Sequence, residues 1–317
     1  MLAWVLRTVP LGDALAALAR LTPAQIGALI LLNGLIFLTF SGRWWILLVA
    51  QGHALPYLRL SAYRLVAFGV TYFTPGPQFG GEPVQIILVQ RRHGVPSATA
   101  LSALALDKAL ELLANFAFLA AGVVLILGWD LLPPQQERLA LAIALGLLAI
   151  PLVLLMTAAA GRRPFSWLMA GVARFFPPRP GGLMARSVAV LAQAEAQSSA
   201  LFRDRPGALI LAVVVSGLSW AGMVGEYWLL LGFLGVDLSI AQAIGALTAA
   251  RLAYLLPLPG GLGALEASQV LALTLLGFDP AAGIAVSLII RLRDVITGLA
   301  GLLLGWRLGR DRPMRSE

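Results

Sequence analysis

The sequence predicts an all-α polytopic membrane protein with about seven full transmembrane helices and two short, broken or re-entrant segments. Hydrophobic residues make up 59% of the 317 positions, and mean hydropathy is +0.87. Charged residues are 12% of the chain, about half of the roughly 25% that soluble domains carry. Apolar runs recur at the length of about 20 residues that a helix needs to cross a bilayer.

Five apolar runs have the length of full spans, and shorter or more polar runs at 57–74 and 240–256 complete the seven. The five long runs are 27–50, 97–127, 139–160, 207–234 and 281–306. The short segments 79–92 and 261–278 each adjoin a stretch rich in proline and glycine. Because these elements fill most of the chain, a soluble catalytic domain has no room, and residues 1–317 are expected to form a single transmembrane domain.

Composition excludes several classes of function. The net charge of +8 comes from arginines in loops and tails, where orientation and anionic lipid account for it better than nucleic acid does. Cysteine is absent, which excludes disulfides, thiolate metal sites and cysteine nucleophiles. His53 and His93 stand alone, so no metal site and no cofactor are expected.

Arginine distribution predicts the orientation in the membrane. The basic segment 162–205 and the tail 309–317 should face the cytoplasm, whereas 128–137 and 235–242 lack Arg and Lys and should be external. Residues 165–182 have the pattern of an interfacial amphipathic helix broken by prolines, serving as a connector or as a regulatory element.

The chain also resembles itself. "YFTPGPQFGGEPVQ" from Tyr72 matches "YLLPLPGGLGALEASQ" from Tyr254, with Glu82 aligned to Glu266. The matching continues to pair Gly94, Ala98, Lys108 and Glu111 with Gly277, Ala281, Arg291 and Asp294. The first short segment ends at cytoplasmic arginines and the second at the external side, so the two copies should be inverted.

Inverted repeats with broken segments are typical of transporters whose site lies near the bilayer midplane. Repeat one is expected at about 27–127 and repeat two at about 207–308. A linking helix and a cytoplasmic amphipathic segment should occupy 139–206 between them.

The Pro-Gly stretches are expected to be non-helical backbone that lines a cavity, since such backbone survives in a bilayer only where protein or water covers it. Helix N-termini there would suit a phosphate. The predicted cavity residues are Pro77, Gly80, Gly81, Glu82, Pro259, Gly260, Gly261, Gly263 and Glu266. Two alternatives stay open: ordinary turns at the membrane surface, and glutamates that only satisfy helix dipoles rather than bind an amine, a proton or a cation.

Charged residues within the spans predict a network that gates or couples transport, because ionisable groups in a membrane helix face the interior and pair. The members are Asp107, Lys108, Glu111, Glu226, Arg251, Arg291, Arg293 and Asp294. A pair between Glu226 and Arg251 is one hypothesis. A structural ion-pair lock between the repeats is the alternative role for the network. Lys108 is the only lysine, and a lysine can release a proton where an arginine cannot.

Two tryptophan-arginine groups fit interfacial anchors. These are Arg43 with Trp44 and Trp45, and Trp306 with Arg307.

These motifs resemble those of the flippase-like family known as the lysylphosphatidylglycerol synthase transmembrane domain. The first element is Pro77, Gly80, Gly81 and Glu82 followed by Asp107, Lys108 and Glu111; the second is Pro257, Pro259, Gly260, Gly261, Gly263 and Glu266 followed by Arg291 and Asp294. The resemblance implies translocation of a phospholipid or polyprenyl-linked lipid in a bacterial inner membrane, without a synthetase domain.

Three functions are compatible with these observations to different degrees. A flippase-like transporter fits them best. An accessory scaffold of a lipid or cell-envelope pathway is the alternative. An intramembrane lipid-modifying enzyme fits less well, because it needs a dense acidic metal site or a histidine-containing phosphatase pattern, so no enzymatic activity is expected.

Overall fold

The computed structural model describes residue 16 and residues 19–74, 80–129, 133–175, 182–256, 258 and 261–310, of which 134, 172–175 and 183 are described for their backbone alone. These residues form eleven α-helices and contain no strand. The helices are α3 (Pro23–Ala50), α4 (Tyr57–Phe73), α5 (Glu82–His93), α6 (Ser97–Leu127), α7 (Pro134–Ala159), α8 (Pro164–Phe175), α9 (Leu183–Asp204), α10 (Pro206–Phe233), α11 (Ile240–Ala253), α12 (Ala264–Leu275) and α13 (Pro280–Arg310). The all-α prediction is confirmed.

Each predicted apolar run coincides with one helix, but the basic segment 162–205 is more ordered than its sequence indicated. It contains α8, where an amphipathic helix was expected, and also the 22-residue α9. The Glu195 side chain on α9 accepts hydrogen bonds from the backbone amides of Phe165 and Ser166 at 2.8 and 3.0 Å, and so caps the start of α8. This cap joins residues some 30 positions apart and therefore leaves no local sequence signal.

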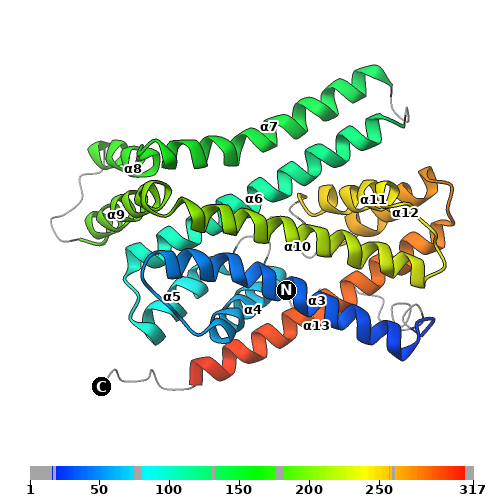
Figure 1. The fold of residues 1–317 in the computed structure, drawn as a ribbon, viewed down its shortest axis with the longest axis horizontal. Coiled ribbons are helices and arrows are strands. Elements are labelled where there is room, and N and C mark those ends of the chain that lie inside the picture. The colour runs from blue at the N-terminus through cyan, green and yellow to red at the C-terminus, as the bar shows by residue number, and fades with distance from the viewer. Residues whose placement is uncertain are drawn as a thin grey trace.

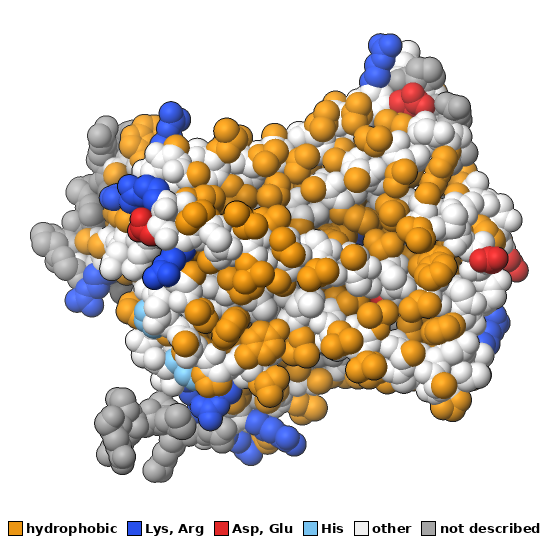
Figure 2. Space-filling view, viewed as in Figure 1, with side chains coloured by type: hydrophobic (Ala, Val, Ile, Leu, Met, Phe, Trp, Pro, Cys, Tyr) orange, Lys and Arg blue, Asp and Glu red, His pale blue; other side chains and the backbone are white. Residues whose placement is uncertain are grey.

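The outer surface is that of a membrane protein. Helices α3, α6, α7 and α10 are long and apolar enough to cross a bilayer, since 28 residues span about 42 Å against a hydrocarbon core of about 30 Å. Large apolar side chains such as Ile30, Met156, Ile210 and Leu303 are more than half exposed. In Figure 2 apolar atoms cover the middle of the molecule, and charged side chains gather mainly toward its two ends.

Two halves of the chain have matching helices. Both bounds of α10, Pro206 and Phe233, lie 183 positions after those of α3, Pro23 and Ala50. The same shift carries α6 onto α13 at both ends. In Figure 1, α3 runs from right to left and α10 from left to right, while α6 and α13 also run in opposite directions.

Local details follow the same shift. Trp45 Nε1 donates to the carbonyl of Leu55 at 2.9 Å, and Trp228 Nε1 donates to that of Leu238 at 2.6 Å. Glycines in the left-handed region also pair off, Gly52 with Gly235 and Gly94 with Gly277. Each half therefore makes the same turn after its first long helix, and a matching one after its short helix, α5 or α12.

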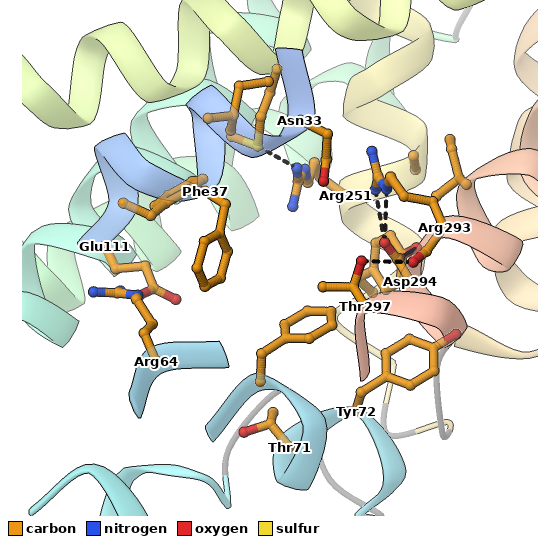
Figure 3. Close-up of a pocket in the computed structure, with 18 of the residues that line it drawn as sticks. Asn33, Phe37, Arg64, Thr71, Tyr72, Glu111, Arg251, Arg293, Asp294 and Thr297 are labelled. Carbon is orange, nitrogen blue, oxygen red and sulfur yellow. Dashed lines mark hydrogen bonds and ion pairs between the residues drawn. The ribbon is translucent and has the colours of Figure 1, made fainter. Parts of the chain in front are cut away.

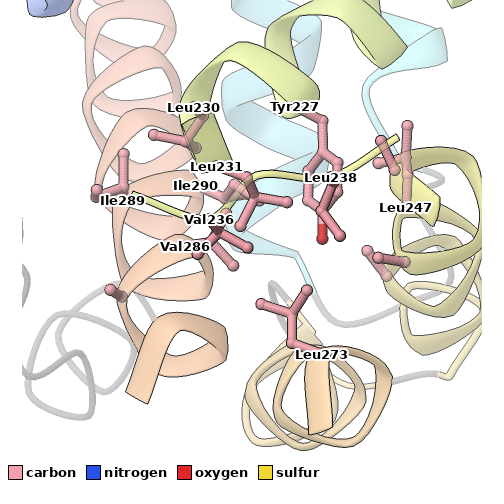
Figure 4. Packing of buried hydrophobic residues seen from close by; sticks show 14 of the residues in the cluster. Tyr227, Leu230, Leu231, Val236, Leu238, Leu247, Leu273, Val286, Ile289 and Ile290 are labelled. Carbon is pink, nitrogen blue, oxygen red and sulfur yellow. The ribbon is translucent and has the colours of Figure 1, made fainter. Parts of the chain in front are cut away.

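The halves have separate apolar cores and pack tightly against each other. One core, shown in Figure 4, joins α10 to α13 through side chains such as Leu231, Leu273 and Val286. Another joins α3 to α6 and their surroundings. Helices α4 and α13 approach so closely that a methyl group on Gly69 would lie 2.5 Å from the carbonyl oxygen of Gly298, and one on Gly301 would overlap the carbonyl of Leu65.

Candidate functional site

A cavity of about 320 Å³ lies between the two halves. Its wall is formed by side chains of α3, α4, α5 and α6 and by side chains of α10, α11 and α13. Among the described residues, four basic and four acidic side chains line it: Arg64, Lys108, Arg251, Arg293, Glu82, Glu111, Glu226 and Asp294. In Figure 3 Arg64 and Glu111 lie on one side, Arg293 and Asp294 on the other, and Phe37 between them.

On the side of α3 to α6, two carboxylates of α6 bind two arginines. Asp107 is fully buried and accepts hydrogen bonds from Arg43 Nε at 2.6 Å and from Arg64 Nη2 at 2.9 Å. Glu111 Oε2 accepts from Arg43 Nη2 at 3.1 Å and from Arg64 Nη2 at 3.2 Å. Three helices, α3, α4 and α6, are thereby joined through charge-assisted hydrogen bonds.

Lys108 lies between two carboxylates at the cavity wall. Its Nζ contacts Glu82 Oε1 at 3.1 Å and Glu111 Oε1 at 3.2 Å. The second contact is the i,i+3 pair that helical spacing predicts. Glu82 Oε2 also accepts from the amide of Gly80 at 2.7 Å, so this glutamate both satisfies backbone at the start of α5 and lines the cavity.

On the side of α10 to α13, one arginine is shared by two carboxylates. Arg293 contacts Glu226 Oε1 at 2.8 Å and Asp294 Oδ1 at 2.9 Å. Asn33 Nδ2 donates to Glu226 at 3.2 Å, and the Tyr254 hydroxyl donates to Asp294 at 3.2 Å. The predicted pair of Glu226 with Arg251 is therefore wrong, because Arg293 on α13 occupies the carboxylate instead.

Arg251 has an unusual environment. Its guanidinium carbon lies 5.0 Å from the centre of the Trp220 ring, and its Nη2 lies 2.8 Å from the sulfur of Met223. Its Nε is buried and has no hydrogen-bond partner among the described residues. A cation over an indole face is stabilised, but neither neighbour carries a compensating charge.

A second glutamate-cation pair lies behind the cavity wall. Arg291 is 1% exposed and contacts Glu266 Oε1 at 2.5 Å. Glu266 Oε2 accepts from the amide of Gly263 at 3.0 Å. Glu266 and Arg291 are not among the residues that line the cavity.

The other predicted residues divide into three groups. Gly261 lines the cavity. Four others do not line the cavity but hydrogen-bond to neighbouring side chains. The amides of Gly80, Gly81 and Gly263 donate to Glu82, Thr71 and Glu266, and Asp107 accepts from Arg43. Pro77, Pro259 and Gly260, with the neighbouring Pro75 and Pro257, lie outside the described residues.

The interpretation of Arg43 as an interfacial anchor is wrong. Arg43 and Trp44 are 0% and 1% exposed, because this part of α3 packs inside the bundle rather than at the membrane surface. Arg-Trp-Trp near the end of an apolar run is typical of both positions, so the sequence does not distinguish them. Arg64, Asn33 and Tyr254 were missed. Arg64 had a usable signal, since it lies mid-helix in the apolar run 57–74.

The acidic groups at the cavity are arranged for pairing with cations. Among the described residues, no group of three or more His, Cys, Asp or Glu side chains could hold a metal ion. Each of the four lining carboxylates instead contacts Lys108, Arg43, Arg64 or Arg293.

Fold and site together define a helical membrane protein with an internal cavity lined by charged side chains of both signs. The chain belongs to the family described as the lysylphosphatidylglycerol synthase TM region, whose model matches residues 1–301. It is also similar to a UPF0104 membrane protein of Methanothermobacter thermautotrophicus, with 24% identity over 288 residues, covering 89% of this chain and 84% of that protein. No solved structure matches the chain. The family resemblance read from the motifs is confirmed.

Proposed function

We propose that the protein translocates the headgroup of a membrane lipid through the cavity between its two halves. The observation that supports this best is the wall of eight charged side chains inside a bundle whose outer surface is apolar. A polar headgroup can enter such a cavity while its acyl chains remain in the bilayer. Membership of a family named for a phospholipid synthase is in keeping with a lipid substrate.

The cost of placing charges inside a membrane protein, together with their partial exposure, favours a transport cavity over a purely structural ion-pair lock. A single charge at the centre of a membrane helix costs about 2.5–3.5 kcal/mol on insertion scales, so such residues mark a transport path or a tightly bound pair. Several of these side chains are only partly buried: Lys108, Glu111 and Arg293 keep 23%, 31% and 35% of their side-chain surface. A purely structural lock needs no such exposure to an internal space.

The proposal includes a membrane topology. Seven helices would cross the bilayer, and α5 and α12, each of 12 residues, would be short broken or re-entrant segments. The constant shift of 183 positions and the opposite helix directions support inverted repeats. Arginines between α7 and α10 and at the end of α13 favour a cytoplasmic side there, with the C terminus, in a bacterial inner membrane.

The test is reconstitution into liposomes that contain tail-labelled fluorescent phospholipids, with a membrane-impermeant quencher added outside. We expect wild-type protein to raise the fraction of label that becomes accessible, and Lys108→Met to slow it by roughly tenfold. Arg310→Gln is the control, because Arg310 lies over the ring of Trp306 at the end of α13, away from the cavity.

Failure of wild-type protein to move anionic, zwitterionic or isoprenoid lipid, with or without an ion gradient, would overturn the proposal. An accessory scaffold would then be favoured. No covalent chemistry is proposed for the cavity, and release of phosphate or of a headgroup by purified protein would contradict that part.

A further inference from the structure

The charges around the cavity favour one chemical class of lipid, an inference that rests on the proposed function. We propose that the cavity takes a zwitterionic phospholipid headgroup, with its phosphate against Arg251 and its ammonium against Glu226 and Asp294. Three features of the cavity support this: a cation with no carboxylate in contact, two carboxylates that share one cation, and equal numbers of basic and acidic lining side chains among the described residues.

The first feature is the lack, among the described residues, of a carboxylate in contact with Arg251. Of the four basic residues that line the cavity, Arg64, Lys108 and Arg293 each lie within 4.0 Å of a carboxylate. In the part of the chain that the structure describes, Arg251 has no such contact, and its nearest interactions are with the uncharged Trp220 and Met223. Its buried Nε also has no hydrogen-bond partner there.

A guanidinium held this way is ready to bind an anion. Asp294 and Glu226 act on Arg251 only from beyond contact distance. A cation in the interior with no carboxylate in contact is costly, so the site gains when an anion binds to it. The planar fork of arginine matches the two oxygens of a phosphodiester, and Trp220 holds the group by its ring face. Figure 3 shows Arg251 on the cavity wall beside Asn33.

Two carboxylates of the same half of the cavity form the second feature. Glu226 and Asp294 share the single cation Arg293, with contacts of 2.8 and 2.9 Å. Asn33 and Tyr254 give them further hydrogen bonds but no charge. Two carboxylates share one guanidinium in direct contact, so an ammonium group would give them a second cation in contact and up to three hydrogen bonds.

The third feature is the summed formal charge of the side chains that line the cavity. Four basic and four acidic side chains line the cavity in the part of the chain that the structure describes, so their formal charges sum to zero. A zwitterion leaves that total at zero, whereas an anionic headgroup would leave a net charge in a region of low dielectric constant. Arg251 can bind the phosphate of a zwitterionic headgroup, and the pair Glu226 and Asp294 can bind its ammonium.

The experiment measures binding and movement separately. Purified protein is offered phosphatidylethanolamine and phosphatidylglycerol with the same acyl chains in equal amounts, and retained lipid is quantified by native mass spectrometry. We expect retention of phosphatidylethanolamine to exceed that of phosphatidylglycerol by roughly tenfold. Liposomes with tail-labelled forms of the same two lipids report movement.

Variants test which residues bind the phosphate and which bind the ammonium of the headgroup. Arg251→Gln should lower retention of phosphatidylethanolamine by roughly tenfold, while Arg251→Lys, which keeps the cation, should retain most of it. Asp294→Asn should lower retention of phosphatidylethanolamine more than that of phosphatidylglycerol. Arg310→Gln is the matched control, because it makes the same change at an arginine stacked on a tryptophan outside the cavity.

The outcomes separate the two proposals. If phosphatidylglycerol is retained and moved in preference, the zwitterionic class is wrong and translocation stands. If Arg251→Gln protein that melts like wild type still retains phosphatidylethanolamine normally, Arg251 is not the phosphate site. If wild-type liposomes move isoprenoid lipid but neither phospholipid, the inference fails and the proposed function stands. If they move none of the three, the proposed function fails and the inference fails with it.

Discussion

In the half formed by α3 to α6, Glu82 and Lys108 line the central cavity, whereas the aligned Glu266 and Arg291 in the half formed by α10 to α13 are not among its lining residues. The contact itself is the same, at 3.1 Å in the first half and 2.5 Å in the second. The surroundings differ: the side chain of Lys108 is 23% exposed and that of Arg291 is 0% exposed. The same type of glutamate-cation pair therefore lines the cavity in one half and is buried in the other.

The contact between α3 and α10 shows a second difference. Arg43 and Glu226 lie 183 positions apart and carry opposite charges, and each reaches across to a polar side chain of the other helix. Arg43 donates to Ser216 at 3.2 Å, and Glu226 accepts from Asn33 at 3.2 Å; Ser216 and Asn33 are again 183 positions apart. The positions of contact are kept while the sign of the charge is reversed, so the two halves differ chemically at matching positions.

We predict the largest effect from Arg43→Met. It leaves the fully buried Asp107 with Arg64 as its remaining charged contact, and breaking a buried pair in this way costs about 3–5 kcal/mol. Thermal unfolding in detergent should show a clear fall in the melting temperature. Arg307→Met, near the exposed end of α13, is the control. An unchanged melting temperature for Arg43→Met would contradict the buried network.

A smaller effect is expected where the halves meet at α4 and α13. Gly301→Ala places a methyl group against the carbonyl of Leu65 and should destabilise the protein by about 1–3 kcal/mol. Gly309→Ala lies on the same helix with open space around it, and should be neutral or slightly stabilising. Equal melting temperatures for the two variants would show that the helices do not pack this closely.

The smallest effect should come from exchanging the cations of the two halves. Lys108→Arg keeps a positive charge between Glu82 and Glu111, so translocation in liposomes should stay within about twofold of wild type if a fixed charge is what the cavity needs. Arg291→Lys is the companion variant in the second half. Loss of translocation by well-folded Lys108→Arg protein would indicate instead that Lys108 must release a proton.

Much of the fold could be predicted from sequence because its elements are local. The run 97–127 was predicted and forms α6 with the same bounds, since Pro96 precedes it and Gly128 follows. Charges inside apolar runs also identified Lys108 and Arg293. Partners could not be predicted: whether Arg43 lies at the surface, or whether Glu226 meets Arg251 or Arg293, depends on how helices far apart in sequence pack together.

The most direct test of the difference between the halves compares Glu82→Gln with Glu266→Gln, the same substitution at the two aligned positions. Translocation of tail-labelled phospholipid is measured in liposomes and normalised to folded protein. We predict that Glu82→Gln slows translocation by roughly tenfold while Glu266→Gln stays within about twofold of wild type, because only Glu82 lines the cavity. Equal rates for the two variants, or a larger loss with Glu266→Gln, would contradict the claim that Glu82, rather than Glu266, takes part in translocation.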